Sequence, residues 1–374
     1  MRQLLRLPNC EWKSEEQRNT VLFAIEGKTD LLVALPTGSG KSIVPMLTAK
    51  ITNKTFAIVV PFISLLEDWE RRLKAANLIH TVFKANMQTF YNTPIILTTT
   101  DIAIREEFAD AVGRSFVNGT FSRLVFDKVH EILVSNDFWA CMQIIWKICR
   151  LPFPIIGMSG TIPVDMESSI KHELCLVPNT TVIRRSSNRP ELSYILDPPI
   201  NKTDILKNRV QEIIRRQNLL PAGRGLVFVT SVDDGFRLAM QLGCEFYCVE
   251  KHLKKTNDTD KKKKGVEADS RATKDLQAAI VQKWRDSTYQ IMVATTAFAA
   301  ENDYPHVRLV ILATTPFDMC SAIQEMGRAG KDGSTATCYI IPMKRLWLPQ
   351  GGSCNDFHGH EAMTKLVWDS DKCL

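Results

Sequence analysis

The residues best suited to chemistry in this chain form a short glycine-rich segment, residues 35–42, which reads LPTGSGKS. Glycines at a turn before a helix let backbone N–H groups point at phosphate oxygens, and a lysine adds a mobile positive charge. Gly38 and Gly40 would form the turn, and Lys41 would reach the β- and γ-phosphates. The segment therefore predicts a binding loop for a nucleoside triphosphate.

One oxygen-bearing residue of the loop is a candidate ligand for the magnesium ion that accompanies such a triphosphate. The Ser42 hydroxyl would ligate the ion directly. The alternative for the loop is a chance glycine turn before a helix, because Leu35 stands where the strict motif has its first glycine. The strand-like run LLVAL before the loop and the helical pattern after it favour phosphate binding.

Short apolar runs and amphipathic stretches alternate around these residues. The runs are LLVAL, FAIVV, PIILT, RLVF and PIIGM in the first half, and GLVFVT, FYCV, IMVAT, LVILAT and CYIIP in the second. Helical patterns follow Lys41 and cover residues 65–73, 233–242 and 272–284. This alternation predicts an α/β protein with two lobes, each a mainly parallel sheet flanked by helices.

Length and composition agree with a folded two-domain protein. The chain has 374 residues, of which 45% are hydrophobic and 24% charged, so a disordered or fibrous protein is excluded. The net charge of +6 permits a polyanionic partner without requiring one. No apolar stretch is long enough for a bilayer, and the scattered cysteines favour a reducing compartment. We expect a nuclear or cytoplasmic protein without membrane contact, the nucleus being favoured in a eukaryote.

The amino-acid sequence of several segments resembles that of the RecQ group of superfamily 2 helicases, and the resemblance covers nearly the whole chain. It rests on PTGSGKS at residues 36–42, WKSEEQ at 12–17, VVPFISLLEDW at 59–69 and QEMGRAGKDG at 324–333. It implies two RecA-like lobes with a short C-terminal extension. It also implies ATP and Mg²⁺ as cofactors, single-stranded or partly duplex DNA as the partner, and ATP-dependent 3′-to-5′ helicase activity.

The resemblance also assigns roles to single residues. Gln17 would hydrogen-bond the adenine base, and Lys41 and Asp127 would act on the phosphates and magnesium. From the second lobe, Gln324 would face the nucleotide and Arg328 would act as the arginine finger, with a solvated arginine as the alternative. The other candidate nucleotide contacts lie in the loop: Thr37, Gly38, Ser39, Gly40 and Ser42.

Contacts with the nucleic-acid backbone are implied at the ends of several predicted strands. The candidates are Pro61, Ser64, Thr99, Thr230 and Thr295. Around Thr99 the match LTTTDIA is loose, so a plain strand-to-helix turn is an equal alternative.

The chain departs from the family pattern directly after Asp127. Lys128 stands where working members carry the glutamate that orients and deprotonates the attacking water. An ammonium group cannot accept that proton, and its charge repels magnesium, so we expect impaired hydrolysis with preserved binding. Glu131 is an alternative base, farther from the strand end. Two hypotheses stay open: a working helicase, and a hydrolysis-deficient module that binds nucleotide and nucleic acid.

Further departures lie in the second half. Lys331 replaces an arginine and loses the planar fork for bidentate phosphate contacts. Residues 299–302 read AAEN where the family is rich in glycine. Residues 251–265 form a basic polar insertion, for which we expect a solvated loop.

The segment SSNRPELSY at residues 186–194 is similar to the family's lobe junction. We therefore expect an ATP-binding lobe at 1–187, a C-terminal lobe at 188–343 and the start of an incomplete subdomain at 344–374. Cys373 matches the first cysteine of the family's zinc-binding subdomain, and only one residue follows it. No complete zinc site is expected, because the other candidates lack paired spacing: Cys244 with Cys248, and Cys354 with His358 and His360.

Overall fold

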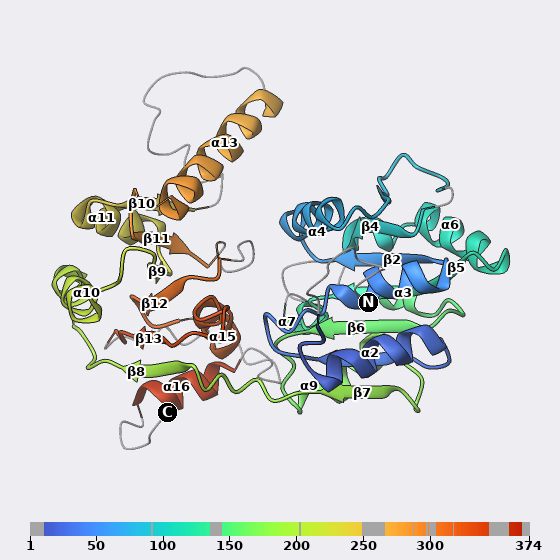
Figure 1. Ribbon diagram of the computed structural model, residues 1–374, viewed down its shortest axis with the longest axis horizontal. Helices are drawn as coiled ribbons and strands as arrows, with labels where there is room; N and C mark the ends of the chain where they lie inside the picture. Colours follow the sequence, from blue (N-terminus) through green and yellow to red (C-terminus); the bar gives the residue numbers. More distant parts are fainter. Residues whose placement is uncertain are drawn as a thin grey trace. The chain divides into compact units, whose positions relative to one another are not determined.

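The computed structural model describes residues 11–90, 93–134, 144–201, 203–248, 266–286, 288–296, 298, 304–316, 318–343 and 359–368. The chain divides into two compact units, residues 1–188 and 189–374. Each unit holds one sheet whose strands pair in parallel and are flanked by helices, which confirms the predicted α/β class (Figure 1). In Figure 1 the first unit runs from blue to green and the second from yellow-green to red.

The sheet of the first unit has seven strands in the order β3-β4-β2-β5-β6-β1-β7. Their bounds are Leu31–Ala34 (β1), Thr55–Val60 (β2), His80–Val82 (β3), Ile95–Thr99 (β4), Phe121–Asp127 (β5), Ile155–Ser159 (β6) and Thr181–Arg184 (β7). The central strands are buried along nearly their whole length, because helices cover both faces of a parallel sheet. This explains why they read as continuous apolar runs.

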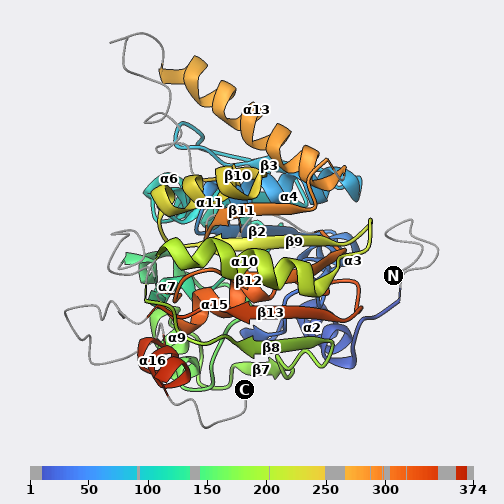
Figure 2. The same cartoon turned by 90° about the vertical axis from the view of Figure 1, so that its left-hand side faces the viewer.

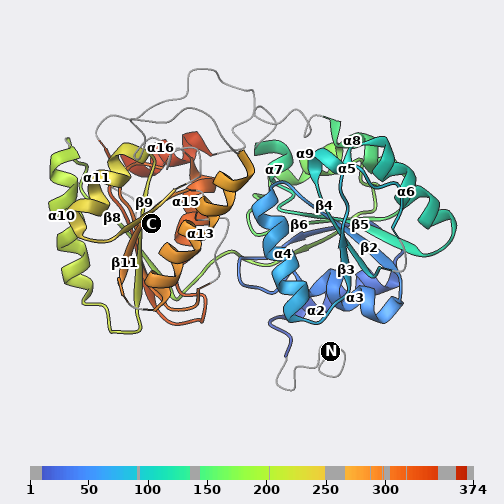
Figure 3. The same ribbon diagram turned by 90° about the horizontal axis from the view of Figure 1, so that it is seen from above.

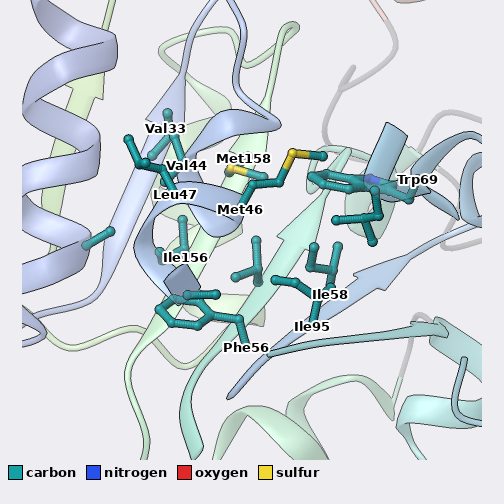
Figure 4. Packing of buried hydrophobic residues seen from close by; sticks show 14 of the residues in the cluster. Val33, Val44, Met46, Leu47, Phe56, Ile58, Trp69, Ile95, Ile156 and Met158 are labelled. Carbon is teal, nitrogen blue, oxygen red and sulfur yellow. The ribbon is translucent and has the colours of Figure 1, made fainter. Parts of the chain in front are cut away.

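One face of this sheet carries α2 (Glu15–Glu26), α3 (Ile43–Thr52) and α4 (Ile63–Ala75) (Figure 3). Val44, Leu47 and Trp69 of these helices belong there to one buried cluster with Phe56 and Ile156 of the strands (Figure 4). The first unit also contains α5 (Thr100–Ala103), α6 (Glu106–Val117), α7 (Glu131–Val134), α8 (Trp146–Cys149) and α9 (Met166–Glu173). Of these, α6 and α9 lie on the opposite face (Figure 3).

The sheet of the second unit has six strands in the order β10-β11-β9-β12-β13-β8. Their bounds are Leu192–Leu196 (β8), Arg224–Val229 (β9), Glu245–Tyr247 (β10), Ile291–Thr295 (β11), Val307–Leu312 (β12) and Ala336–Ile340 (β13). One face carries α10 (Thr203–Gln217) and α11 (Val232–Leu242). The other carries α13 (Val266–Arg285), α15 (Met319–Met326) and α16 (His360–Trp368) (Figures 2 and 3).

Strand order brings the candidate site residues to one edge of the first sheet. In the register of the parallel pairs, Ala34 lies beside Ser159, and Asp127 lies beside Met158. Parallel strands end at the same edge, so the loop after β1, the end of β5 and the end of β6 are neighbours. The carboxyl edge of the sheet therefore assembles residues far apart in sequence.

Candidate nucleotide-binding site

The glycine-rich loop joins β1 to α3, as predicted. Gly38 and Gly40 have φ angles of 80° and 79°, in the left-handed region that favours glycine. A Cβ atom added at Gly40 would lie 2.4 Å from Nε2 of Gln17, whereas one at Gly38 would meet no atom within 4 Å. A side chain at the second glycine would therefore strain the turn and also displace the Gln17 amide.

Gln17 links the first helix to this loop. The Ser14 side chain caps α2 by accepting the backbone N–H of Gln17 at 3.1 Å, which sets the start of the helix. The Gln17 side chain is buried and donates through Nε2 to the carbonyl of Gly40 at 3.1 Å. Its Oε1 accepts the backbone N–H of Lys13 at 2.8 Å. The predicted base-binding residue thus lies directly against the phosphate loop.

Lys13 is a loop contact that sequence reasoning did not identify. Its Nζ donates to the carbonyl of Gly38 at 2.8 Å. Lys13 lies in the segment WKSEEQ, but nothing in that sequence predicts a contact with Gly38, 25 residues later.

The ammonium group of Lys41 lies on the loop that carries it. Nζ donates to the carbonyls of Leu35 at 2.7 Å and Pro36 at 3.0 Å. The residues after β6 pack against the same place, because a Cβ at Gly160 would lie 3.1 Å from Cγ2 of Thr37 and 3.4 Å from Nζ of Lys41. The loop and the segment after β6 therefore form one packed unit.

Asp127 accepts two hydrogen bonds, one from a distant side chain and one from the backbone of the next residue. Its Oδ2 accepts the indole N–H of Trp69 at 2.8 Å, and its Oδ1 accepts the backbone N–H of Lys128 at 2.9 Å. Trp69 is buried, and Figure 4 shows its ring among the core side chains with Met46 extending toward it. The packed indole therefore holds the carboxylate in one orientation.

Ser42 accepts a hydrogen bond from a cation. Nη1 of Arg72 donates to its Oγ at 2.6 Å, and Nη2 of Arg72 lies 2.5 Å from Oδ2 of Asp68. The four-residue spacing of Asp68 and Arg72 on one helix is visible in the sequence. The contact of Arg72 with Ser42 is not. The two predicted magnesium ligands have the oxygen chemistry that this ion prefers. Both residues already accept hydrogen bonds. The Ser42 hydroxyl accepts one from the Arg72 guanidinium, and the Asp127 carboxylate accepts the two described above.

His130 lies fully buried behind the site. Its Nδ1 is 2.7 Å from Oγ of Ser159, and its Nε2 is 3.4 Å from Oε1 of Glu131. Ser159 Oγ also accepts the backbone N–H of Thr161 at 3.1 Å. With its proton on Nε2, the neutral imidazole accepts the serine hydroxyl at Nδ1, and its N–H lies on the side of the Glu131 carboxylate.

The pKa of His130 lies well below its usual range. Burial is the largest cause, and the charges of Lys128 and Lys41 add to it. Both ammonium groups therefore act electrostatically on the same buried ring. The Lys128 backbone itself adopts a left-handed φ of 56°, which is uncommon for a residue with a side chain.

The predicted nucleotide contacts of the second unit lie in and after α15. Gln324 belongs to this helix, and Arg328, which is buried, follows it. Arg189, a further residue that sequence reasoning did not single out, donates through Nη2 to the carbonyls of Ala329 and Gly330 at 2.8 Å each. It thereby anchors the turn after Arg328. The approach of Gln324 and Arg328 to a nucleotide stays a prediction.

The predicted backbone contacts lie at the carboxyl edges of the two sheets. Pro61 follows β2, whose last residue pairs with Thr99 at the end of β4, and Ser64 lies in the first turn of α4. In the second unit, Thr230 follows β9, whose last residue pairs with Thr295 of β11. Strand pairing thus groups these residues within each unit, while their role in binding stays a prediction.

No group of three or more His, Cys, Asp or Glu that could hold a metal occurs within the described part of the chain. Burial raises the pKa of Cys244 to about 11 and also raises the pKa of Cys248, which keeps both thiols protonated. Among the described helices, none is both long and apolar enough to cross a membrane. Several sequence predictions fall outside the described residues, namely those on Cys354, His358, Cys373, residues 251–265 and residues 299–302.

Two family models match the chain in the order of its two units. The DEAD/DEAH box helicase model covers residues 14–169, and the helicase conserved C-terminal domain model covers residues 204–333. The first match includes the glycine-rich loop, Asp127 and the buried His130. The second includes Gln324 and Arg328.

Known proteins resemble the chain along most of its length. The ATP-dependent DNA helicase Q1 of Pongo abelii is 26% identical over 344 residues, covering 87% of this chain and 50% of that protein. The RecQ-like DNA helicase blm-1 of Caenorhabditis elegans is 24% identical over 349 residues, covering 87% of this chain and 32% of that protein. The chain thus spans about half the length of the Q1 relatives it matches.

Solved structures share the fold. The structure described as S. cerevisiae Dbp5 bound to RNA and ADP BeF3 aligns with a TM-score of 0.64 at 13% identity, covering 95% of this chain and 88% of that one. Two RecA-like lobes are therefore confirmed as the architecture. From the two helicase models in order, and from RecQ-type relatives along most of its length, we conclude that this chain belongs to the RecQ-type group of superfamily 2 helicases.

Proposed function

We propose that this chain binds ATP at the loop of residues 35–42 and single-stranded DNA through residues of both units, while hydrolysing ATP very slowly. One observation carries this proposal: a lysine, Lys128, directly follows Asp127 at the end of β5. The helicase core and its ATP dependence come with the family. The expected loss of turnover rests on Lys128.

The chemistry of the site supports slow hydrolysis. A base that deprotonates the attacking water must be a proton acceptor, and an ammonium group is not one. Burial lowers the pKa of His130 most, and the positive charges of Lys128 and Lys41 lower it further, so both cations act on this ring beside the site. His130 itself is buried and engaged with Ser159, so it is badly placed to act as the base.

The loop supports the binding part of the proposal. Its glycines have the left-handed backbone of a phosphate-binding turn, and the ammonium group of Lys41 lies at the loop, where it donates to the carbonyls of Leu35 and Pro36. The polar residues at the carboxyl edges of the sheets, including Ser64, Thr99 and Thr230, offer hydroxyl groups to a nucleic-acid backbone. Because DNA is a polyanion and the chain has a net charge of +6, DNA affinity should fall as the salt concentration rises.

A second candidate function is a working 3′-to-5′ DNA helicase that uses ATP and Mg²⁺, with Glu131 as the base. Glu131 begins α7 only four residues beyond Asp127, which favours this possibility. Its carboxylate lies 3.4 Å from Nε2 of His130, so catalysis would require it to leave that partner.

ATP turnover with and without single-stranded DNA separates the two functions. We expect the natural chain to bind a fluorescent ATP analogue but to turn over ATP no faster than a Lys41→Ala control, while Lys128→Glu raises the rate. DNA-stimulated turnover clearly above the control would favour the working helicase. A measurable natural rate that Lys128→Glu leaves unchanged would show that Lys128 is not the block.

A further inference from the structure

The contact between Arg72 and Ser42 suggests how this site neutralises a triphosphate. We propose that the Arg72 guanidinium supplies, at the Ser42 hydroxyl, the positive charge that magnesium supplies in a phosphate-binding loop, so that ATP binding by this chain depends little on magnesium. This inference rests on the proposed ATP site and adds the source of its charge.

Arg72 is held on the loop by a second residue of its own helix. Nη1 donates to Oγ of Ser42 at 2.6 Å, while Nη2 lies 2.5 Å from Oδ2 of Asp68, one helical turn earlier. The Asp68 side chain is only 11% exposed and also pairs with Arg71. Asp68 therefore orients the guanidinium, although part of the Arg72 side chain is open to solvent.

Three cations of the chain are hydrogen-bonded to the loop. Lys13 lies on the carbonyl of Gly38, Lys41 on those of Leu35 and Pro36, and Arg72 on the hydroxyl of Ser42. A triphosphate is a polyanion whose charge must be neutralised by some cation at its site. The first unit carries that positive charge on its own side chains.

The same arrangement disfavours a metal ion. A magnesium ion on Oγ of Ser42 would lie next to the Arg72 guanidinium, whose side chain is 42% exposed, and like charges at contact distance repel even where water screens them in part. Asp127, the other predicted ligand, already accepts hydrogen bonds at both oxygens and is followed by a cationic residue, Lys128. The oxygen chemistry of the pair fits magnesium, but the surrounding charge does not.

A guanidinium is chemically suited to replace the ion as a phosphate partner. Its planar fork donates two parallel hydrogen bonds to phosphate oxygens, and it stays protonated at any physiological pH. Rotation about the Arg72 side chain would let one N–H remain on Ser42 while others reach the nucleotide. No proton or electron transfer is needed, so the proposal concerns binding alone.

The test measures the affinity of a fluorescent ATP analogue in excess Mg²⁺ and in excess EDTA. For the natural chain we expect the two dissociation constants to agree within roughly threefold. Arg72→Gln should lose about tenfold or more in EDTA and recover most of that loss in Mg²⁺. Arg71→Gln is the matched control, because Arg71 also pairs with Asp68 but makes no hydrogen bond with a loop residue in the described part of the chain; it should behave like the natural chain.

Arg72→Lys provides a second variant that keeps the charge, and it should bind the analogue in EDTA more tightly than Arg72→Gln. A natural chain that loses about tenfold or more in EDTA overturns the inference while leaving the ATP site intact. Equal magnesium dependence of Arg72→Gln and Arg71→Gln also overturns it. Absence of binding in both Mg²⁺ and EDTA defeats the proposed ATP site itself, and the inference with it.

Discussion

The indole N–H of Trp69 donates a 2.8 Å hydrogen bond to Oδ2 of Asp127. Trp69 lies on α4, whose first turn carries Ser64, a predicted contact of the nucleic-acid backbone. Asp127 ends β5, which is separated only by β6 from β1 and the phosphate loop that follows it. One rigid helix therefore joins the predicted DNA contact to the predicted nucleotide site, and it does so through a buried aromatic side chain.

Replacing Trp69 by Phe should both destabilise the first unit and weaken nucleotide binding. A hydrogen bond to a charged group contributes about 1.5–3 kcal/mol, and Asp127 would lose one such partner. Urea unfolding gives the stability change, and titration with a fluorescent ATP analogue gives the affinity. Trp284→Phe is the control, because this buried indole bonds the carbonyl of Gly225 in the second unit. If both variants bind the analogue equally well, Trp69 has only a structural role.

The two loop glycines should respond differently to alanine. Both need a left-handed backbone, so each variant should lose about 1–2 kcal/mol of stability through strain. Only Gly40→Ala also displaces Gln17, since its Cβ would lie 2.4 Å from Nε2. We therefore expect Gly40→Ala to bind ATP analogues more weakly than Gly38→Ala by tenfold or so. Equal affinities of the two variants would mean that the Gln17 contact does not shape the site.

His130 should make the chain less stable in mild acid. Its pKa in the folded protein is lowered by burial and by Lys128 and Lys41, so the unfolded chain binds a proton first as the pH falls below about 6.5. The stabilisation is present above that pH and is lost below it, by at most about 1.4 kcal/mol per pH unit. His130→Gln should remove this slope in urea unfolding between pH 7 and pH 5. Parallel pH profiles for the two proteins would contradict the assignment.

Glu325 should produce the opposite dependence in the second unit. Burial, with a smaller contribution from Asp318, raises the pKa of this carboxyl to about 8. The folded protein therefore holds a proton that the unfolded chain releases above pH 4.5, and stability is lost as the pH rises toward 8. Glu325→Gln, which stays neutral, should flatten the fall in unfolding free energy between pH 6 and pH 8. If Glu325→Gln leaves the pH dependence of the unfolding free energy unchanged, the Glu325 carboxyl is in contact with water and its pKa is not raised.

Loss of Arg189 should loosen the turn that follows Arg328. Its guanidinium holds the carbonyls of Ala329 and Gly330, and it pairs with Glu191. Arg189→Ala leaves those buried carbonyls without this donor, which costs about 1–3 kcal/mol of stability. Hydrogen exchange at residues 328–331 should rise in this variant. Arg308→Ala, which removes an ion pair with Asp332 in the same unit, serves as the control.

The sequence by itself determined the fold class and the loop, because both depend on local patterns. Buried parallel strands need continuous apolar runs, and a phosphate loop needs glycine and lysine at set spacing, so LLVAL and LPTGSGKS were sufficient. The short strands β3, β7 and β8 were not predicted. All three are edge strands. Edge strands are partly exposed to solvent, so their residues, such as those of β8, do not form an apolar run.

Only the tertiary structure decided which side chains surround the predicted ligands. Trp69 and Asp127 are 58 residues apart, Arg72 and Ser42 are 30 apart, and Lys13 and Gly38 are 25 apart. These pairs meet because the strand order places β2, β5, β6 and β1 side by side, while α2, α3 and α4 pack on the same face of that sheet. Hydrophobic periodicity shows which face of a helix or strand is buried, but not which other elements pack against it. The cations that surround the predicted nucleotide site therefore follow from tertiary packing alone.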